Sequence, residues 1–448
     1  MASARLTKTI SSSTGKIFTL SVWLKKADNA AISTIFHLTS DSNTNKYIEI
    51  ASKSGYGIDF QLKNGTSGTN GTYLRRRTTR VLRDLSAWYH IVIRFDSTNS
   101  TASDRARIYI NGEQATDIDQ DGTPDVPLNF VSDLNNASSN LSLAGFVGGS
   151  NYLNGQLAHF HFTDGYSYAP TEFGETDATT GIWKPKTSPS VTYGTNGFFL
   201  RFDNSANMGL DSSGQSNNFT TNGTIIQAKD TPTNVFATLN PLNVPTSNAP
   251  TFSNVNSKGT SNSSGKFIGS STIGVSSGKW YMEVKVTEQS GSNSYIGVAD
   301  EIGTIENARN NGNGYGNGIL YRTNGQYRTS TNGSTTDVNY GNSYAQGDII
   351  GIALNCDDNE IVFYKNGTAQ NSGTAISIPT PDGFLFLNIS LGSAAEESFE
   401  VNFGNGYFGT TAVTSAQNPT DGIGIFEYTP PTNYRALCTK SINAQEYS

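Results

Sequence analysis

Apolar and polar residues alternate along most of this chain. Residues 18–25 read FTLSVWLK, residues 158–162 read AHFHF, and residues 280–286 read WYMEVKV. Because successive side chains of a β-strand point to opposite faces of the sheet, each segment predicts a strand that is buried on one face and exposed on the other. No window of helical length carries a convincing apolar stripe. The pattern therefore predicts an all-β chain.

A strand-turn-strand phrase occurs twice, far apart in the sequence. The first copy spans Trp88–Gln114 and the second spans Asp348–Gln370. In each copy an apolar strand runs into an Asp, a second strand returns, and the phrase closes on Asn-Gly, at Asn111-Gly112 or Asn366-Gly367. Asn-Gly between alternating strands is a strong hairpin signal, and many such turns are typical of antiparallel β-sandwiches or barrels.

The chain has 448 residues, more than one hydrophobic core usually serves. Alternating strands concentrate in residues 1–200 and 252–410, and we expect an antiparallel sandwich domain in each. Residues 201–251 are polar and dotted with proline, which indicates a long ordered connector laid over the surface. Residues 411–448 contain one hydrophobic patch and two adjacent prolines, and we expect an extended tail.

Charge and hydropathy exclude several classes of protein. Thirty Lys and Arg residues against 37 Asp and Glu residues leave a net charge of −7, which argues against nucleic acid as a partner. No apolar run has the length of a signal peptide or a membrane span, so we expect synthesis in a cytoplasm and no membrane insertion. Surface polarity comes mainly from amides and hydroxyls, as in β-rich extracellular or virion proteins. Cys356 and Cys438 are too few for a disulfide framework, and free thiols are favoured over one bridge.

The order of several segments resembles two known sandwich families. Residues 18–26, 84–96, 107–114 and 153–165 are similar in succession to the concanavalin A-like, laminin-G-like jelly roll. Residues 276–286, 294–300, 347–367 and 401–408 resemble a SPRY domain, another two-sheet sandwich. These resemblances imply two lectin-like sandwich domains in that order.

Four further segments resemble predicted structural proteins of tailed phages, particularly marine ones. They are residues 173–186, 193–220, 230–242 and 430–439. A β-sandwich fold does not require these four sequences, so their joint occurrence is a specific sign of the resemblance. The resemblance implies a virion component: a tail, a fibre or a capsid-surface appendage.

Enzymatic activity is not expected. A glycan hydrolase needs two carboxylates about 5 to 9 Å apart, whereas Glu49, Glu283 and Glu400 each stand alone in alternating strands. His159 and His161 share one face of a strand and are candidate metal ligands, but no third ligand accompanies them and a polar sheet face is the favoured interpretation.

An Asp-rich segment is the sharpest candidate for metal binding. Asp117, Asp119, Asp121 and Asp125 are spaced like the first oxygen ligands of a Ca²⁺ loop, with the Thr123 carbonyl at position 7. Position 12 of that pattern is Leu128 instead of the bidentate Glu. Ca²⁺ is therefore a candidate cofactor, while a solvated loop without an ion remains the alternative.

Two further clusters are candidate binding surfaces. A basic patch of arginines would meet anionic lipopolysaccharide or an acidic virion neighbour, or else its members lie on the solvent side of a strand and cover apolar neighbours. An aromatic segment rich in Asn, Gly, Ser and Thr suits a glycan or protein surface, unless its tyrosines merely cover a sheet edge. The basic patch is Arg75, Arg76, Arg77, Arg80 and Arg83; the aromatic segment carries Tyr315, Tyr321, Arg322, Tyr327, Arg328, Tyr340 and Tyr344.

These observations predict a non-enzymatic virion structural protein with a role in adhesion. Its expected partners are a host-surface glycan or protein and other virion proteins, and we expect it to act as a homo-oligomer. The alternatives are a cellular secreted or surface lectin, and a carbohydrate-active enzyme or its accessory module.

Overall fold

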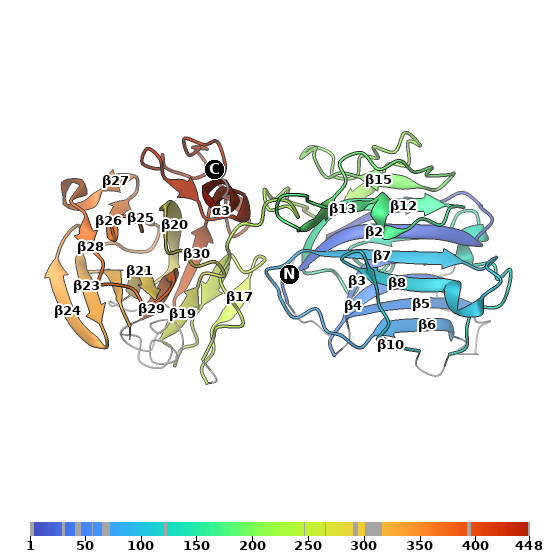
Figure 1. Ribbon diagram of the computed structural model, residues 1–448, viewed down its shortest axis with the longest axis horizontal. Coiled ribbons are helices and arrows are strands. Elements are labelled where there is room, and N and C mark those ends of the chain that lie inside the picture. The colour runs from blue at the N-terminus through green and yellow to red at the C-terminus, as the bar shows by residue number, and fades with distance from the viewer. Residues whose placement is uncertain are drawn as a thin grey trace. The chain divides into compact units, whose positions relative to one another are not determined.

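A computed structural model describes residues 4–28, 32–40, 46–55, 57–64, 72–120, 123–245, 247–264, 266–289, 294–300, 316–391 and 396–446. Contacts within the chain divide it into two units, residues 1–227 and 228–448 (Figure 1). Each unit contains two large antiparallel sheets, and α3 (Thr439–Glu446) is the one α-helix in the described residues. The prediction of an all-β chain with two sandwiches is confirmed.

The first unit packs two sheets around one hydrophobic core. The larger sheet has the order β10 (Ile118–Asp119), β6 (Thr72–Thr78), β5 (Ile58–Asn64), β4 (Lys46–Lys53), β3 (Ile32–Thr39), β11 (Asn140–Leu143), β1 (Arg5–Thr9) and β16 (Thr220–Asn222). The smaller sheet has the order β15 (Phe198–Leu200), β12 (Gly155–Asp164), β2 (Ile17–Lys26), β7 (Tyr89–Asp96), β8 (Ala106–Ile110) and β9 (Glu113–Gln114). Alternate side chains meet between the sheets: Phe18 of β2 stacks on Phe95 of β7 at 4.9 Å and meets Phe60 of β5 edge-on at 6.2 Å.

The outer face of the smaller sheet is buried as well. In β2 every residue after Ile17 is buried, although the alternation predicted a strand exposed on one side. The covering segment contains η3 (Pro170–Glu172) and the hairpin of β13 (Gly174–Thr176) and β14 (Trp183–Pro185). The Trp183 indole donates a hydrogen bond of 2.9 Å to His90 Nδ1 on β7. Polar residues on this face therefore lie between two layers of protein.

The second unit repeats the two-sheet arrangement. One sheet has the order β17 (Thr251–Ser253), β18 (Lys258–Thr260), β30 (Ser398–Asn402), β20 (Lys279–Glu288), β25 (Ile349–Asn355), β26 (Glu360–Lys365) and β27 (Thr368–Ala369), with β28 (Ile376–Ser377) beside β26 and β33 (Arg435–Ala436) beside β20. The other has the order β19 (Phe267–Ser270), β29 (Leu385–Leu391), β21 (Ser294–Asp300), β22 (Gly318–Arg322), β23 (Gln326–Thr331) and β24 (Ser334–Asn339). The remaining short elements are β31 (Tyr407–Phe408), β32 (Thr411–Ala412), η1 (Ala102–Asp104), η2 (Asp133–Asn135) and η4 (Gln370–Gly373).

The repeated phrase forms the same hairpin in both units. Asn111 and Asn366 adopt left-handed φ angles of 51° and 47°, each before a glycine of positive φ. The Asn side-chain oxygen accepts a hydrogen bond from the backbone N–H of His90 or Ile349, in both cases at 2.8 Å. The Asn N–H donates to the carbonyl of that same residue, again at 2.8 Å. The Asn thus ties the turn at the end of the phrase to the start of the first strand of the phrase, β7 or β25, which is a physical reason for the phrase.

The connector and the tail are built into the units more fully than their composition indicates. The structure divides the chain after Gln227, because β16 pairs with β1 while Phe236 and Leu239 are buried in the second unit. In the tail, β33 runs parallel to β20 and is followed by α3, so the segment is not extended throughout. Cys356 and Cys438 are both buried free thiols. None of the helices in the described part of the chain has both the length and the apolar character needed to cross a membrane.

Glu283 of β20 is fully buried beneath the C-terminal tail. Its carboxylate accepts hydrogen bonds from the backbone N–H groups of Glu427 and Tyr428, both at 2.9 Å, and from Asn402 Nδ2 at 3.2 Å. Burial raises the pKa of Glu283 from 4.5 to about 7, against the opposing effect of these donors. One acidic side chain therefore holds the tail backbone against the sheet.

We predict that Glu283 makes stability depend on pH near neutrality. Because folding raises its pKa from 4.5 to about 7, the folded chain binds this proton more tightly, and the resulting stabilisation is present below pH 4.5 and lost as the pH rises through 7. Urea unfolding at several pH values measures the unfolding free energy of the wild type and of Glu283→Gln. The difference, wild type minus variant, should decrease by up to about 3 kcal/mol as the pH rises from 4.5 to above 7. Glu288→Gln, at the exposed end of the same strand, is the control for loss of a glutamate that does not bind the tail, and it should not abolish the pH dependence assigned to Glu283. A difference that does not vary with pH would contradict the prediction.

Candidate binding pocket beside an arginine–aspartate ladder

Arginines of the expected basic patch lie on and just after β6, opposite carboxylates. Arg75 pairs with Asp59 at 2.9 Å, Arg76 with Asp125, Arg77 with Asp119 at 2.7 Å, and Arg80 with Asp117 at 2.7 Å. The register of β10 on β6, which places Asp119 opposite Arg77, produces part of this pairing. We call these four pairs the arginine–aspartate ladder. Two clusters that the sequence indicated as separate sites are thus one structural element.

Most of the basic patch is engaged in ion pairs, and its role in binding an anionic partner stays a prediction. Four of its five arginines have a carboxylate partner: Asp59 of β5 pairs with Arg75, and the Asp-rich segment, which folds back along β6, supplies the other three. Arg83 is exposed, and no ion pair is found for it in the described part of the chain. A surface whose charges are compensated in this way attracts anions weakly.

The calcium prediction stays a prediction, and it now competes with these ion pairs. The guanidinium of Arg80 lowers the pKa of Asp117 to about 2 by donating a hydrogen bond to its carboxylate. The Thr123 hydroxyl donates a hydrogen bond to the Gln120 carbonyl at 2.7 Å. Asp121 lies outside the described residues. Among those that are described, no three His, Cys, Asp or Glu side chains converge as a metal site.

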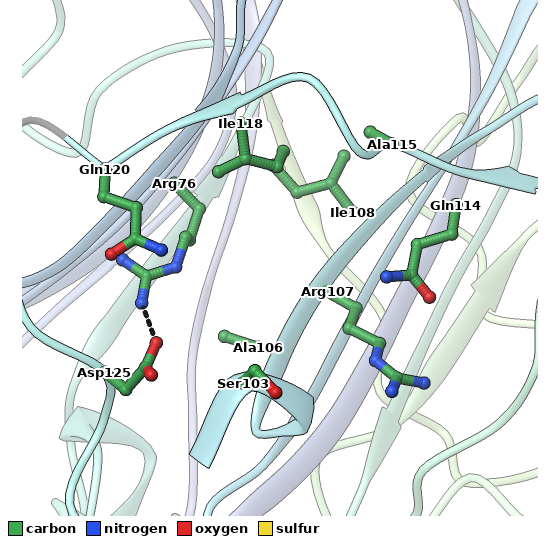
Figure 2. A pocket seen from close by; sticks show the side chains of 10 residues that line it. All are labelled: Arg76, Ser103, Ala106, Arg107, Ile108, Gln114, Ala115, Ile118, Gln120 and Asp125. Carbon is green, nitrogen blue, oxygen red and sulfur yellow. Dashed lines mark hydrogen bonds and ion pairs between the residues drawn. The ribbon is translucent and has the colours of Figure 1, made fainter. Parts of the chain in front are cut away.

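Beside the ladder lies a small pocket of about 100 Å³ (Figure 2). The apolar part of the pocket consists of Ile108 on β8, Ile118 on β10, and Ala115 between β9 and β10. Its polar lining consists of Arg76, Ser103, Arg107, Gln114, Gln120 and Asp125, and Ala106 completes it. Figure 2 shows the guanidinium groups of Arg76 and Arg107 on different sides of the pocket, with Asp125 bonded to Arg76.

The pocket offers both donors and acceptors of hydrogen bonds. Arg107 is ion-paired with Asp104, as Arg76 is with Asp125, so both cationic side chains are compensated. The amides of Gln114 and Gln120 lie on exposed residues, and each amide carries two donor hydrogens and an acceptor oxygen. The site suits an uncharged, hydroxyl-rich group better than a highly charged one.

Sequence reasoning missed most of this pocket. Arg76 and Asp125 were singled out for other reasons, whereas Arg107, Gln114 and Gln120 were not singled out at all. Gln114 follows the repeated Asn-Gly turn, which was the one available signal. The pocket forms only because β8 and β10, from different sheets, approach one another.

Three tyrosines expected at a binding surface belong to the hydrophobic core instead. Tyr321, Tyr340 and Tyr344 are 0%, 9% and 3% exposed. Tyr321 stacks on Phe363 at 5.2 Å, and the Tyr344 hydroxyl donates to the Ser294 carbonyl at 2.9 Å. A buried tyrosine with a satisfied hydroxyl is a packing residue. The prediction of a ligand surface is therefore wrong for these three residues.

The other members of the aromatic segment are engaged or lie elsewhere. Arg322 and Arg328 both pair with Asp337, and their guanidinium groups lie over the Tyr295 ring at 5.4 and 4.9 Å. Tyr327 is half-buried against Tyr340. Tyr315 lies outside the described residues. The segment forms strands β22, β23 and β24, and its role in binding stays a prediction.

The two strand histidines are enclosed. The Nδ1 atom of His161 hydrogen-bonds the Tyr193 hydroxyl at 2.9 Å, and its ring stacks on Phe199 at 3.9 Å. His159 sits at a bulge of β12 with a φ of 45°, and its ring lies 6.5 Å from that of His161. Burial lowers the pKa of His159 to about 4, and that of His161 well below its usual value. Both are therefore neutral parts of the covered face at pH 7.

Family comparison finds two matches. Residues 2–172 match the concanavalin A-like lectin/glucanases superfamily, and residues 279–406 match the SPRY domain. The two matches occur in the predicted order. Each match falls within one of the two structural units. Among curated protein sequences, none matches this chain.

Solved structures with similarity include sandwich domains of several origins. The SPRY domain of human HERC1 is 22% identical, with a TM-score of 0.26, and the match covers 32% of this chain and 87% of that one. Domain 4 of AbnA, a GH43 extracellular arabinanase from Geobacillus stearothermophilus solved with arabinotriose, is 18% identical, with a TM-score of 0.26 and coverages of 36% and 65%. Domains LG4-5 of the mouse laminin α1 chain are 10% identical, with a TM-score of 0.29 and coverages of 97% and 85%.

We predict that the cost of breaking the arginine–aspartate ladder depends on burial. Asp59 is fully buried and also pairs with Lys53 at 2.6 Å, so Asp59→Asn leaves two cations without their carboxylate. The expected loss is about 3 to 5 kcal/mol of unfolding free energy. Asp117→Asn is the matched control, because its partner Arg80 is 43% exposed, and it should cost about 1 kcal/mol or less. Equal losses in urea unfolding of the two variants would contradict this view of the ladder.

Proposed function

We propose that this chain is a non-enzymatic binding protein whose first unit recognises an uncharged glycan at the pocket beside the arginine–aspartate ladder. The pocket carries the proposal. Each sugar hydroxyl both donates and accepts a hydrogen bond, and the Gln114 and Gln120 amides and the two compensated arginines offer both kinds of partner. The apolar part at Ile108, Ala115 and Ile118 suits the C–H groups of a sugar ring.

The size of the pocket supports weak recognition of one sugar unit. Its volume of about 100 Å³ is well below the roughly 300 to 1,000 Å³ of pockets that enclose a drug-sized ligand. Firm adhesion then requires several sites on one assembly, since linking weak sites raises the overall affinity. This is the reason to propose a homo-oligomer.

Binding without turnover is consistent with the positions of the strand carboxylates. Glu283 is buried and accepts hydrogen bonds from the backbone of the tail. Glu49 is buried in the other unit, and burial raises its pKa. These two carboxylates serve the fold and lie outside the pocket, and the carboxylate that does line the pocket, Asp125, is ion-paired with Arg76.

The proposed setting is the virion of a tailed phage, where the chain is a tail, fibre or capsid-surface appendage. This part of the proposal is supported by the resemblance of residues 173–186, 193–220, 230–242 and 430–439 to phage structural proteins. The family match of the first unit, whose description includes lectins, supports adhesion to a host-surface glycan. Contacts with other virion proteins would anchor the chain on the particle.

We predict that the Gln114→Ala/Gln120→Ala double variant binds glycans at least about tenfold more weakly, because two hydrogen-bonding groups leave the pocket. The measurement is binding of bead-coupled protein to a panel of neutral bacterial-surface oligosaccharides. Gln215→Ala, an exposed glutamine of the same unit outside the pocket, is the control and should bind like the wild type. Unchanged binding by the double variant would reject the pocket, and cleavage of a panel sugar would reject the non-enzymatic assignment.

Immunogold labelling tests the virion assignment. An antibody raised against the purified chain should label the surface of intact tailed-phage particles that encode it. Disrupted particles serve as a control for epitopes enclosed within the virion. A chain present in the lysate but missing from purified particles, by labelling and by mass spectrometry, would overturn the assignment.

A further inference from the structure

One sheet edge of the second unit differs from the other edges of the four large sheets. In the residues that the structure describes, seven of the eight edge strands have two to four residues. The exception is β24, with six residues, all of them exposed. Native proteins shorten, charge or cover sheet edges because an open edge pairs with other strands. A long uncovered edge therefore requires an explanation.

The hairpin geometry determines which backbone groups of β24 face outward. Asn332 and Gly333 have φ angles of 47° and 86° and form a two-residue turn that pairs Thr331 with Ser334. In such a hairpin this closing pair is hydrogen-bonded, and hydrogen-bonded pairs then alternate along the strands. The N–H and C=O groups of Thr335, Asp337 and Asn339 consequently point away from β23. In the described residues β23 is the one strand paired with β24.

The side chains of β24 carry none of the usual protection against pairing. The strand reads STTDVN, without proline or lysine, and its register on β23 is continuous. Its single charge, Asp337, is held by Arg322 and Arg328 of the same sheet. Thr335, Thr336 and Val338 are β-branched and favour strand pairing. Within the described part of the chain, this edge is exposed and its one charge is compensated.

We propose that β24 pairs antiparallel with β24 of a second copy of this chain about a two-fold axis, joining two six-stranded sheets into one. A two-fold interface must be complementary to itself, and a Ser/Thr/Asn strand meets this condition through cross-strand hydroxyl pairs. Compensation of Asp337 within each copy limits repulsion between like charges. The inference rests on the homo-oligomer in the proposed function and names its interface, whereas glycan binding by a single pocket does not require it.

The test is the oligomeric state of the full chain, measured by analytical ultracentrifugation over a range of concentrations. The wild type should form a dimer, and Thr335→Pro should shift dissociation at least about tenfold toward monomer. Proline at this position removes an outward N–H and leaves the hydrogen bonds to β23 in place. Thr335→Ser, which keeps both the outward N–H and the hydroxyl, is the matched control and should dimerise like the wild type.

Two further measurements make the result decisive. If Thr335→Pro lowers the melting temperature, Thr335→Lys replaces it, because a lysine on an edge strand discourages pairing while keeping the backbone intact. Amide hydrogen exchange of the wild type should show protection of Thr335, Asp337 and Asn339 that increases with protein concentration. A monomeric wild type, or a dimer that survives both substitutions, would overturn the proposal. Glycan binding measured on the same samples shows separately whether the proposed function holds.

Discussion

The need to satisfy backbone hydrogen bonds at sheet edges governs this structure. Four large sheets present eight edges, and each edge leaves a row of N–H and C=O groups without a strand partner. Very short strands limit these rows at seven of the edges. This requirement explains why strands form in the two segments that the sequence predicted as a connector and an extended tail. Strand β16 of the connector pairs with β1, and β33 of the tail pairs with β20. Among the strands of the described residues, β24 alone presents a long row of this kind, and so an interface is inferred there.

The charged side chains of the arginine–aspartate ladder hold segments of the fold together and are not free to attract a charged partner. The arginine–aspartate ladder runs from the fully buried Asp59 to the half-exposed Arg80. Breaking the buried pair therefore costs more folding free energy than breaking the exposed pair, which water screens. Glu283 has a comparable role in the second unit, where an acidic side chain holds tail backbone. In both units a charge that looks available in the sequence is used to attach an adjoining segment.

Because the charged side chains of the ladder are ion-paired, the structure is consistent with adhesion through shallow, polar contacts. The pocket beside the ladder is small and its ionic groups are compensated, so one site contributes little affinity. Pairing of two chains through β24 would present two such pockets on one body. Rigid sheets limit the conformational entropy lost on binding, which favours recognition by preformed groups.

The sequence by itself determined the local structure. Alternation is a property of neighbouring residues, and it correctly predicted the strands. The repeated Asn-Gly predicted hairpins that proved to share the same hydrogen bonds at Asn111 and Asn366. The order of the two domains also followed from short phrases that each occupy one stretch of chain.

Tertiary structure alone decided what each strand face meets. Period-two alternation distinguishes two faces but does not show whether a distant segment covers the second one, as Trp183 does over His90 from 93 residues away. For the same reason, Tyr321 and Tyr344 became core residues, and the arginines of β6 were joined to aspartates that the sequence offered as calcium ligands. The pocket depended on the meeting of β8 and β10 across two sheets. Contacts between residues far apart in the chain are set by the packing of whole sheets, and local patterns carry no record of them.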